Sequence, residues 1–209
     1  MELNLDSNNI FEALRKKIIR LELQPESVLN LSELAETFGV SRTPIKEILI
    51  SLQAEGWIMR QGSHFIVTPL SLDRIREITE IRMIMEVQAN IWAMQRITPI
   101  EMKELKNIES EILKLDKETP NEIIVDYDFK IHQYIFKTAK NTQLSIMLER
   151  ILSHYLRFWL SIPRQINIQN FFNEVLELIS ALETKDEELV RDCTVKHIRN
   201  SISEIMGTS

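Results

Sequence analysis

Apolar residues recur every three or four positions along the first part of the chain, and this spacing predicts three helices. The first apolar stripe comprises Ile10, Phe11, Leu14, Ile18 and Leu21. The second comprises Leu34, Ala35 and Phe38, and the third comprises Ile45, Ile48, Leu49 and Leu52. Each predicted helix therefore has one face suited to a hydrophobic core and another face that stays polar.

A tight turn is predicted between the second and third helices, within residues 31–52. Gly39 follows the second stripe, where glycine closes a helix in the left-handed conformation without a side-chain penalty. Ser41 is a favoured N-cap for the third helix. Pro44 falls in the first turn of that helix, where no backbone N–H is needed as an internal donor. The segment reads as a helix-turn-helix whose second helix runs from Ser41 to Glu55.

Two short strand-like runs, residues 57–60 and 64–68, follow Gly56 and are joined by the hairpin signal Gln61-Gly62-Ser63. Three helices followed by a hairpin predict a winged helix-turn-helix. The polar start of the last helix offers hydroxyl, guanidinium and ammonium groups, which suit DNA phosphates and base edges. The predicted DNA-binding residues are Ser41, Arg42, Thr43, Lys46, Gly62 and His64.

The run GVSRTPIKEIL at residues 39–49, with LQAEGWI at residues 52–58, resembles the signature of GntR-type bacterial transcription regulators. The family form is close to GVSRTPVREAL followed by L-x-x-E-G. Lys46 stands where arginine is usual, and Ser32 stands where many members of the FadR branch carry a basic residue. Lysine keeps the positive charge but cannot form the two parallel hydrogen bonds by which arginine recognises a base, so base recognition at this position is expected to differ from that of the family. The resemblance implies DNA binding, and the alternative is that the SRTP run only starts a helix.

From Leu72 onward the apolar spacing is helical, which predicts an all-α antiparallel bundle of six helices. The sequences TPIE at residues 98–101 and TPNE at residues 119–122 are expected to be capping boxes that open the second and third helices. Asn141 is the expected left-handed stop of the third helix. The proline and serine of residues 68–71 mark a boundary between a DNA-binding domain at residues 1–70 and a helical domain at residues 71–209. The predicted fold class is therefore mainly α.

Composition changes this picture only in part. The 209 residues are 44% hydrophobic, enough for a packed core, and the net charge of −6 does not favour nucleic-acid binding. Basic residues of the first domain nevertheless gather in two helices, at Arg15, Lys16, Lys17, Arg20, Arg42 and Lys46. This local placement suits DNA, whereas the weak overall charge predicts weak non-specific binding and reliance on a homodimer. The single cysteine, the polar N-terminus and the lack of a long apolar run predict a cytoplasmic protein with no membrane segment.

The helical region resembles the FCD domain, the ligand-binding module of FadR-type GntR regulators, in its six-helix, VanR-like form. The resemblance rests on RMIME at residues 82–86, DYDFKIH at residues 126–132, AKNTQL at residues 139–144, and the run of residues 179–198. It implies a divalent metal held by one aspartate and three histidines. Asp128, His132 and His197 match three of these ligands, and Val175 stands at the position of the fourth.

Asp128 and His132 are four residues apart on one helix, so both project from the same face. An aspartate with two imidazoles suits zinc, nickel or manganese. Because valine cannot bind a metal, binding is expected to be weak or absent. His154 is a further candidate for the missing ligand, and the alternative interpretation is that His132 and His197 are ordinary core histidines.

Arg82 and Arg157 are the predicted effector-pocket residues, since each guanidinium can grip a carboxylate through two hydrogen bonds. An ion pair between Arg82 and Glu86, at positions i and i+4, is an equally good interpretation of that arginine.

The leading hypothesis is a homodimeric repressor that binds a double-stranded DNA operator and responds to a small carboxylate effector. The alternative is a regulator for which a divalent metal is itself the signal. An enzyme is not expected, because the sequence shows no nucleophile–base pair, phosphate-binding glycine loop or H-E-x-x-H motif.

Overall fold

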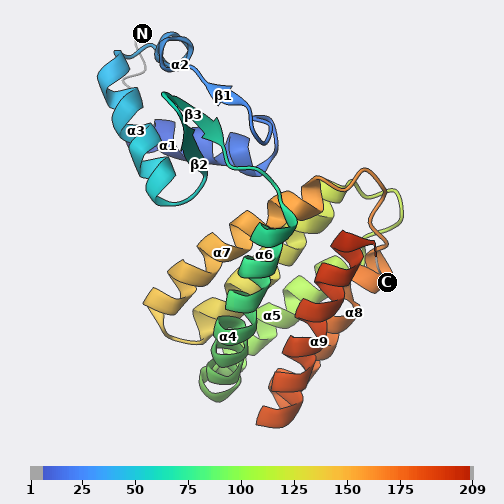
Figure 1. Cartoon of the computed structure of the whole chain (residues 1–209). Coiled ribbons are helices and arrows are strands. Elements are labelled where there is room, and N and C mark those ends of the chain that lie inside the picture. Colours follow the sequence, from blue (N-terminus) through green and yellow to red (C-terminus); the bar gives the residue numbers. More distant parts are fainter. Residues whose placement is uncertain (1–6, 208–209) are drawn as a thin grey trace. The chain divides into compact units, whose positions relative to one another are not determined.

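The computed structural model describes residues 7–207. Contacts divide the chain into two units, the first ending at Ser71 and the second beginning at Leu72 (Figure 1). This division falls in the same short connection as the domain boundary expected from the sequence. Each unit encloses its own hydrophobic side chains, and the two are described separately.

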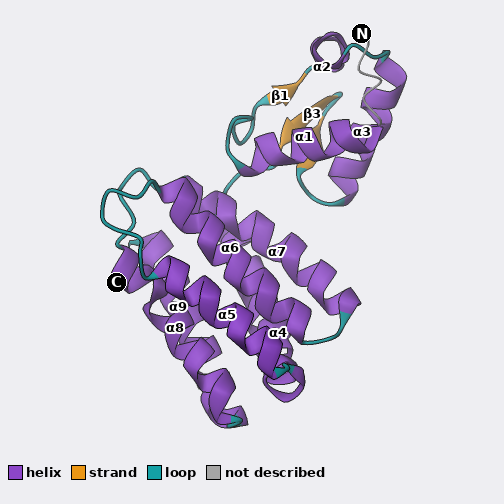
Figure 2. Ribbon diagram, turned by 180° about the vertical axis from the view of Figure 1, so that it is seen from behind, coloured by secondary structure: helices purple, strands orange, loops and turns teal. Residues whose placement is uncertain are grey.

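Residues 7–71 form a winged helix-turn-helix, as predicted, with three helices and a small antiparallel sheet (Figure 2). The helices are α1 (Ser7–Ile19), α2 (Leu31–Phe38) and α3 (Arg42–Ala54). The strands are β1 (Val28–Leu29), β2 (Ile58–Gln61) and β3 (His64–Val67), in the order β1-β3-β2. Helices and sheet enclose one core, which includes Ile10, Leu14, Ile18, Ile45, Leu49, Leu52, Trp57 and Phe65.

Two details of this unit differ from the sequence prediction. Helix α1 ends at Ile19, and Leu21 lies beyond it with a left-handed backbone (φ 59°), so Leu21 does not extend the helical stripe. Strand β1 is absent from the prediction because two residues are too few to show alternation. It forms because Val28 and Leu29 pair with β3.

The turn between α2 and α3 follows the prediction at Gly39 but not at Ser41. Gly39 closes α2 in the left-handed conformation (φ 66°). Ser41 occupies the N-cap position of α3, but its side chain makes no capping hydrogen bond. The effective cap in this region is Asn30 before α2, whose side-chain oxygen accepts a hydrogen bond from the backbone N–H of Ser32 at 2.9 Å.

The described residues 72–207 form six helices, which confirms the predicted all-α bundle. They are α4 (Leu72–Arg96), α5 (Pro99–Ile112), α6 (Asn121–Thr138), α7 (Thr142–Leu160), α8 (Ile168–Thr184) and α9 (Glu187–Met206). The helices lie lengthwise against one another, and α4 packs against α6, α7, α8 and α9 (Figure 1). None of the helices in the described part of the chain combines the length and the apolar character needed to cross a membrane.

The caps of this unit agree with the sequence at one helix and not at two others. Thr98 and Glu101 form the predicted capping box of α5. At α6 the N-cap position is Pro120, which has no side-chain acceptor, and the hydroxyl of Thr119 contacts Asp116 instead. Asn141 is not the left-handed stop: its side chain caps α7, and the left-handed residue is its neighbour (φ 52° at residue 140).

Helix α4 brings polar groups into the interior of this unit. Thr79, Arg82, Glu86 and Asn90 are all buried on it, at spacings of three and four residues. Buried polar groups are costly unless they are hydrogen-bonded. Their presence on the helix that contacts most of the others marks the region where a ligand site is expected.

Candidate functional site

The exposed face of α3 carries the predicted DNA-binding residues. Its other face is held in the core by Ile45, Leu49 and Leu52, so the polar face of this helix is fixed in orientation. Ser41, Arg42, Thr43 and Lys46 are all exposed. Among the described residues neither Arg42 nor Lys46 makes an ion pair, so both cations are available for phosphate or base contacts.

The hairpin of β2 and β3 adds a second exposed edge. Gln61 and His64 pair across the turn, and Gly62 takes a left-handed backbone (φ 61°) as its first residue. This geometry matches a type II′ hairpin, for which glycine is favoured at that position. Gly62 and His64 are both exposed at the tip. The predicted DNA-binding residues thus lie on the start of α3 and on the tip of the wing.

Arg60, which is not among the residues predicted from the sequence, is a further exposed cation on β2 next to the wing tip. Its guanidinium lies over the ring of Phe65, 4.7 Å from the ring centroid. This cation–π contact restricts the side chain of an arginine that stays exposed. The available signal was a basic residue directly before a hairpin turn.

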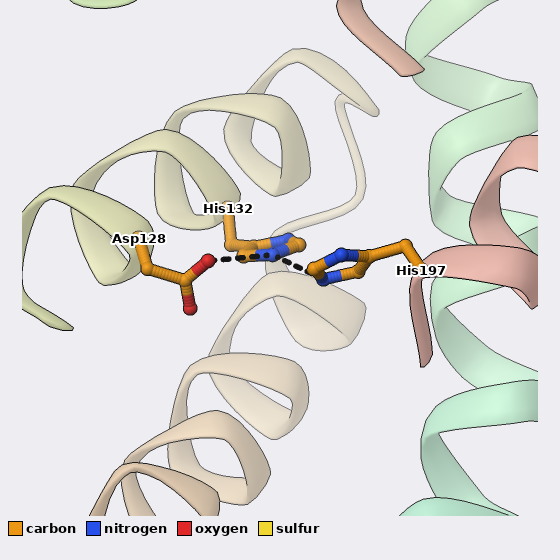
Figure 3. A group of neighbouring side chains, drawn as sticks. All are labelled: Asp128, His132 and His197. Carbon is orange, nitrogen blue, oxygen red and sulfur yellow. Dashed lines mark hydrogen bonds and ion pairs between the residues drawn. The ribbon is translucent and has the colours of Figure 1, made fainter. Parts of the chain in front are cut away.

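A second site lies inside the helical unit, where Asp128 and His132 of α6 meet His197 of α9 (Figure 3). The Nε2 atoms of the two histidines are 3.0 Å apart, and Nε2 of His132 is 3.5 Å from Oδ1 of Asp128. All three side chains are buried. The structure therefore brings together the three residues that the sequence assigned to one cluster.

The pKa shifts of His197 and Asp128 favour the protonation forms that bind a metal. Burial, reinforced by the nearby His132, lowers the pKa of His197 to about 3, so its imidazole is neutral at pH 7. Burial opposes ionisation of Asp128, but His132 and His197 together hold the pKa of that carboxyl below its usual value. A neutral imidazole at His197 and an ionised carboxylate at Asp128 are forms that bind a divalent metal.

The spacing of the donor atoms also fits a metal. Zinc lies about 2.0–2.1 Å from such ligands, which places tetrahedral ligand atoms roughly 3.3 Å from one another. The two distances from Nε2 of His132, 3.0 Å to His197 and 3.5 Å to Asp128, are close to that spacing, and all three donor atoms lie within 4.8 Å of one another. Oδ1 of Asp128 has no hydrogen-bond partner among the described residues. The cluster could therefore hold a metal ion.

The structure offers no fourth protein ligand among the described residues. Val175 is fully buried on α8 and supplies no donor atom. His154 is buried on α7 and is not part of the cluster.

A cavity of about 550 Å³ adjoins the cluster. Asp128 and His197 line it, together with Arg82 of α4 and Tyr155 and Trp159 of α7. This volume is within the range of small-molecule sites. The cavity combines an aromatic wall with buried charged groups, which is the composition expected of a ligand pocket.

Arg82 is held rigidly at this cavity. Its guanidinium bonds both carboxylate oxygens of Glu86, at 2.5 and 3.2 Å, and lies 4.2 Å from the ring centroid of Tyr155. Although burial opposes the charge, Glu86 keeps the pKa of Arg82 above its usual value. Tyr155 is fixed in turn by a 2.6 Å hydrogen bond to Ser201. The ion pair considered from the sequence is therefore present, and Arg82 lines the cavity as well.

Arg157 is fully buried on α7 but does not line this cavity. Burial and the neighbouring Arg74 lower its pKa to about 10. The structure thus separates the two arginines that the sequence assigned to one effector pocket.

Comparison with known families identifies both units. The family described as bacterial regulatory proteins, gntR family, matches residues 6–64, and the FCD domain matches residues 77–200. The chain belongs to the GntR family of transcription regulators. Its FCD domain places it in the FadR-like subfamily, and it is a DNA-binding regulator rather than an enzyme.

Several relatives of this GntR-family regulator cover nearly its whole length. The regulator McbR of Escherichia coli is 25% identical over 190 residues, covering 87% of this chain and 84% of that protein. The gluconate operon transcriptional repressor of Bacillus licheniformis is 23% identical over 205 residues, covering 93% and 81%. The repressor RspR of Escherichia coli is 23% identical over 203 residues, covering 95% and 87%. Several relatives are thus repressors.

The solved structure of Escherichia coli McbR/YncC shares the fold of this regulator. Its TM-score is 0.82 at 21% identity, and the match covers 96% of this chain and 97% of that one.

Proposed function

We propose that this regulator is a cytoplasmic, homodimeric repressor whose affinity for a double-stranded DNA operator is set by a small effector in the FCD domain. The observation that carries the proposal is the pairing of an exposed, cation-bearing α3 with a buried cavity beside Arg82. Two recognition helices in a symmetric dimer would reach two half-sites about one DNA turn apart.

Exposed apolar residues on α4 and α7 support the dimer. The two helices pack side by side, and Ile81, Ile84, Ile146 and Met147 are exposed on them. Ile84 is the most exposed, at 75%. Large apolar side chains exposed on two adjacent helices favour association with another protein surface. We assign the dimer interface to this α4–α7 surface.

A carboxylate on the effector is supported by Arg82. Two of its nitrogens bond Glu86, whereas Nη1 is buried without a hydrogen-bond partner among the described residues. A buried N–H of a charged group gains from an added acceptor. A carboxylate oxygen entering the cavity would supply it.

Metal sensing is the second candidate function, favoured by the cluster of Asp128, His132 and His197. With Val175 in place of a fourth ligand, we expect zinc, nickel or manganese to bind weakly or not at all. A bound ion would supply a localised positive charge at the edge of the cavity.

Selection of bound sequences from a random DNA pool tests the proposal. We expect enrichment of an inverted repeat whose half-sites are about one helical turn apart. Light scattering should show a dimer for the full chain and a monomer for Ile84→Glu. Ile100→Glu is the matched control, since Ile100 is equally exposed on α5 and lies outside the proposed interface. Enrichment of no sequence, or of single half-sites by a monomer, would contradict the proposal.

A further inference from the structure

The cavity beside Arg82 contains more negative charge than a site for a simple anion should have. Glu174 of α8 and Glu204 of α9 line it, in addition to Asp128. The one cavity arginine is already neutralised by Glu86. A ligand that carries only negative charge would be repelled by these carboxylates.

Neither glutamate forms an ion pair in the described part of the chain, although Lys196 is near Glu174 and Arg164 donates a hydrogen bond to the backbone carbonyl of Glu204 at 2.8 Å. Glu174 accepts a hydrogen bond from Nδ2 of Asn200 at 2.7 Å but makes no ion pair. No hydrogen bond or ion pair reaches the carboxylate of Glu204 within residues 7–207, and burial raises the pKa of that group. By contrast, Glu177, one turn from Glu174 and outside this cavity, pairs with Lys196 at 2.6 Å. The carboxylates that line the cavity are thus the ones without an ion pair, and a positively charged ligand group could supply it.

Aromatic rings lie beside these carboxylates. Trp159 and Phe171 line the cavity and contact each other edge to face, with ring centroids 4.6 Å apart. Carboxylates together with aromatic faces favour a cationic amine, because both attract positive charge.

Arg82 and Glu204 lie at different levels of the cavity along α9. Arg82 lies on Tyr155, and Tyr155 bonds Ser201, so the arginine is at the level of Ser201 and His197. Glu204 is one turn beyond Ser201 and two turns beyond His197, on the order of 5–10 Å along the helix axis. Glu174 bonds Asn200, which is next to Ser201, so its carboxylate lies nearer the level of Arg82 than Glu204 does. A ligand that contacts both Arg82 and Glu204 must therefore carry its two charges several bonds apart.

We propose that the cavity takes a small zwitterion, an amino-carboxylate whose carboxylate accepts from Nη1 of Arg82 and whose ammonium group is held by Glu174 and Glu204. This proposal rests on the proposed effector function of the cavity and names the chemistry of the effector. Hydroxyl-bearing or amide-bearing substituents would find donors and acceptors in Asn173, Asn200 and Ser201.

Calorimetry on the purified full chain tests the inference with three probes of equal length: glutarate, 5-aminopentanoate and 1,5-diaminopentane. We expect 5-aminopentanoate to bind at least tenfold more tightly than either of the others. Glu174→Gln and Glu204→Gln should each weaken its binding about tenfold while leaving glutarate binding unchanged or tighter. Glu177→Gln is the matched control and should change neither. In Glu174→Gln the side-chain oxygen still accepts from Asn200, so the local fold is retained.

The inference is overturned if glutarate binds as tightly as 5-aminopentanoate, if no probe binds, or if both glutamine variants behave like the control. Operator titration on the same preparations separates this failure from failure of the proposed function. If the chain binds its selected DNA and glutarate releases that DNA, the proposed function stands and the zwitterion proposal is refuted. If the chain selects no DNA sequence, the proposed function itself is refuted.

Discussion

In the DNA-binding unit the candidate functional side chains are exposed, whereas in the helical unit they are buried. Arg42 and Lys46 stand on the solvent side of α3 and are free of ion pairs among the described residues. Arg82, Asp128 and His197 come from three different helices and meet in the interior. Arginine therefore lies on an exposed surface in one unit and beside a buried cavity in the other.

This difference decides how each unit responds to substitution. An exposed cation remains hydrated, so removing it alters binding and hardly alters folding. A buried ion is stable only with its partner, so removing either partner leaves an uncompensated charge in the interior. Substitutions in the two units should consequently separate binding defects from folding defects.

The largest expected effect is loss of the partner of Arg82. Glu86→Ala leaves a buried guanidinium uncompensated and should lower the free energy of unfolding of the helical unit by about 3–5 kcal/mol. The matched control is Glu187→Ala, which breaks an exposed pair with Arg191 on α9 and should change it by less than about 1 kcal/mol. Urea denaturation followed by circular dichroism measures both. Equal effects of the two variants would contradict the contrast drawn between buried and exposed pairs.

Arg42→Ala should weaken binding to selected operator DNA by about 1–3 kcal/mol if the guanidinium reads a base edge. The free energy of unfolding should stay within about 0.5 kcal/mol, since the residue is exposed. Gel-shift titration measures the first quantity, and Lys103→Ala, which removes an exposed cation from α5, serves as the control. Unchanged DNA affinity in folded Arg42→Ala would remove α3 from the proposed interface.

The winged unit was predictable in most details because its signals are local. Helical spacing of apolar residues located its three helices, and Gly39 and Gly62 occupy the left-handed positions that the turns require. Strand β1 escaped prediction because it forms only through pairing with β3, a contact distant in sequence. The capping difference before α6, in the helical unit, has a local origin, since the hydroxyl of Thr119 contacts Asp116 three residues earlier.

The helical site was predictable in part. The spacing of Asp128 and His132 fixed one face of α6, and the family resemblance supplied His197. The remainder depends on how α4, α7, α8 and α9 pack, which no local pattern encodes. This is why Arg157 was assigned to the same pocket as Arg82, and why Glu174 and Glu204 were not assigned to it at all.

Adding a fourth ligand to the buried cluster tests whether its three donors are arranged for a metal. Val175→His should raise affinity for zinc at least tenfold, or about 1.4 kcal/mol, if the three existing donors are arranged for a metal. Calorimetry on the native and variant chains measures this, with His132→Ala as the control that removes an existing donor. Tight, stoichiometric binding by the native chain that survives His132→Ala would show that the metal site lies elsewhere.

The smallest expected change in stability concerns the two residues at the N-cap positions of α2 and α3, Asn30 and Ser41. Asn30→Ala removes the acceptor for the backbone N–H of Ser32 and should lower the free energy of unfolding of the winged unit by about 1 kcal/mol. Ser41→Ala should have almost no effect on stability, because the Ser41 side chain makes no capping hydrogen bond. Ser41 is exposed at the start of α3, so its substitution should instead weaken operator binding. Thermal unfolding and gel-shift titration of both variants give four values. A stability loss at Ser41 equal to that at Asn30 would show that the serine caps α3, and unchanged operator binding by Ser41→Ala would show that it is not a DNA contact.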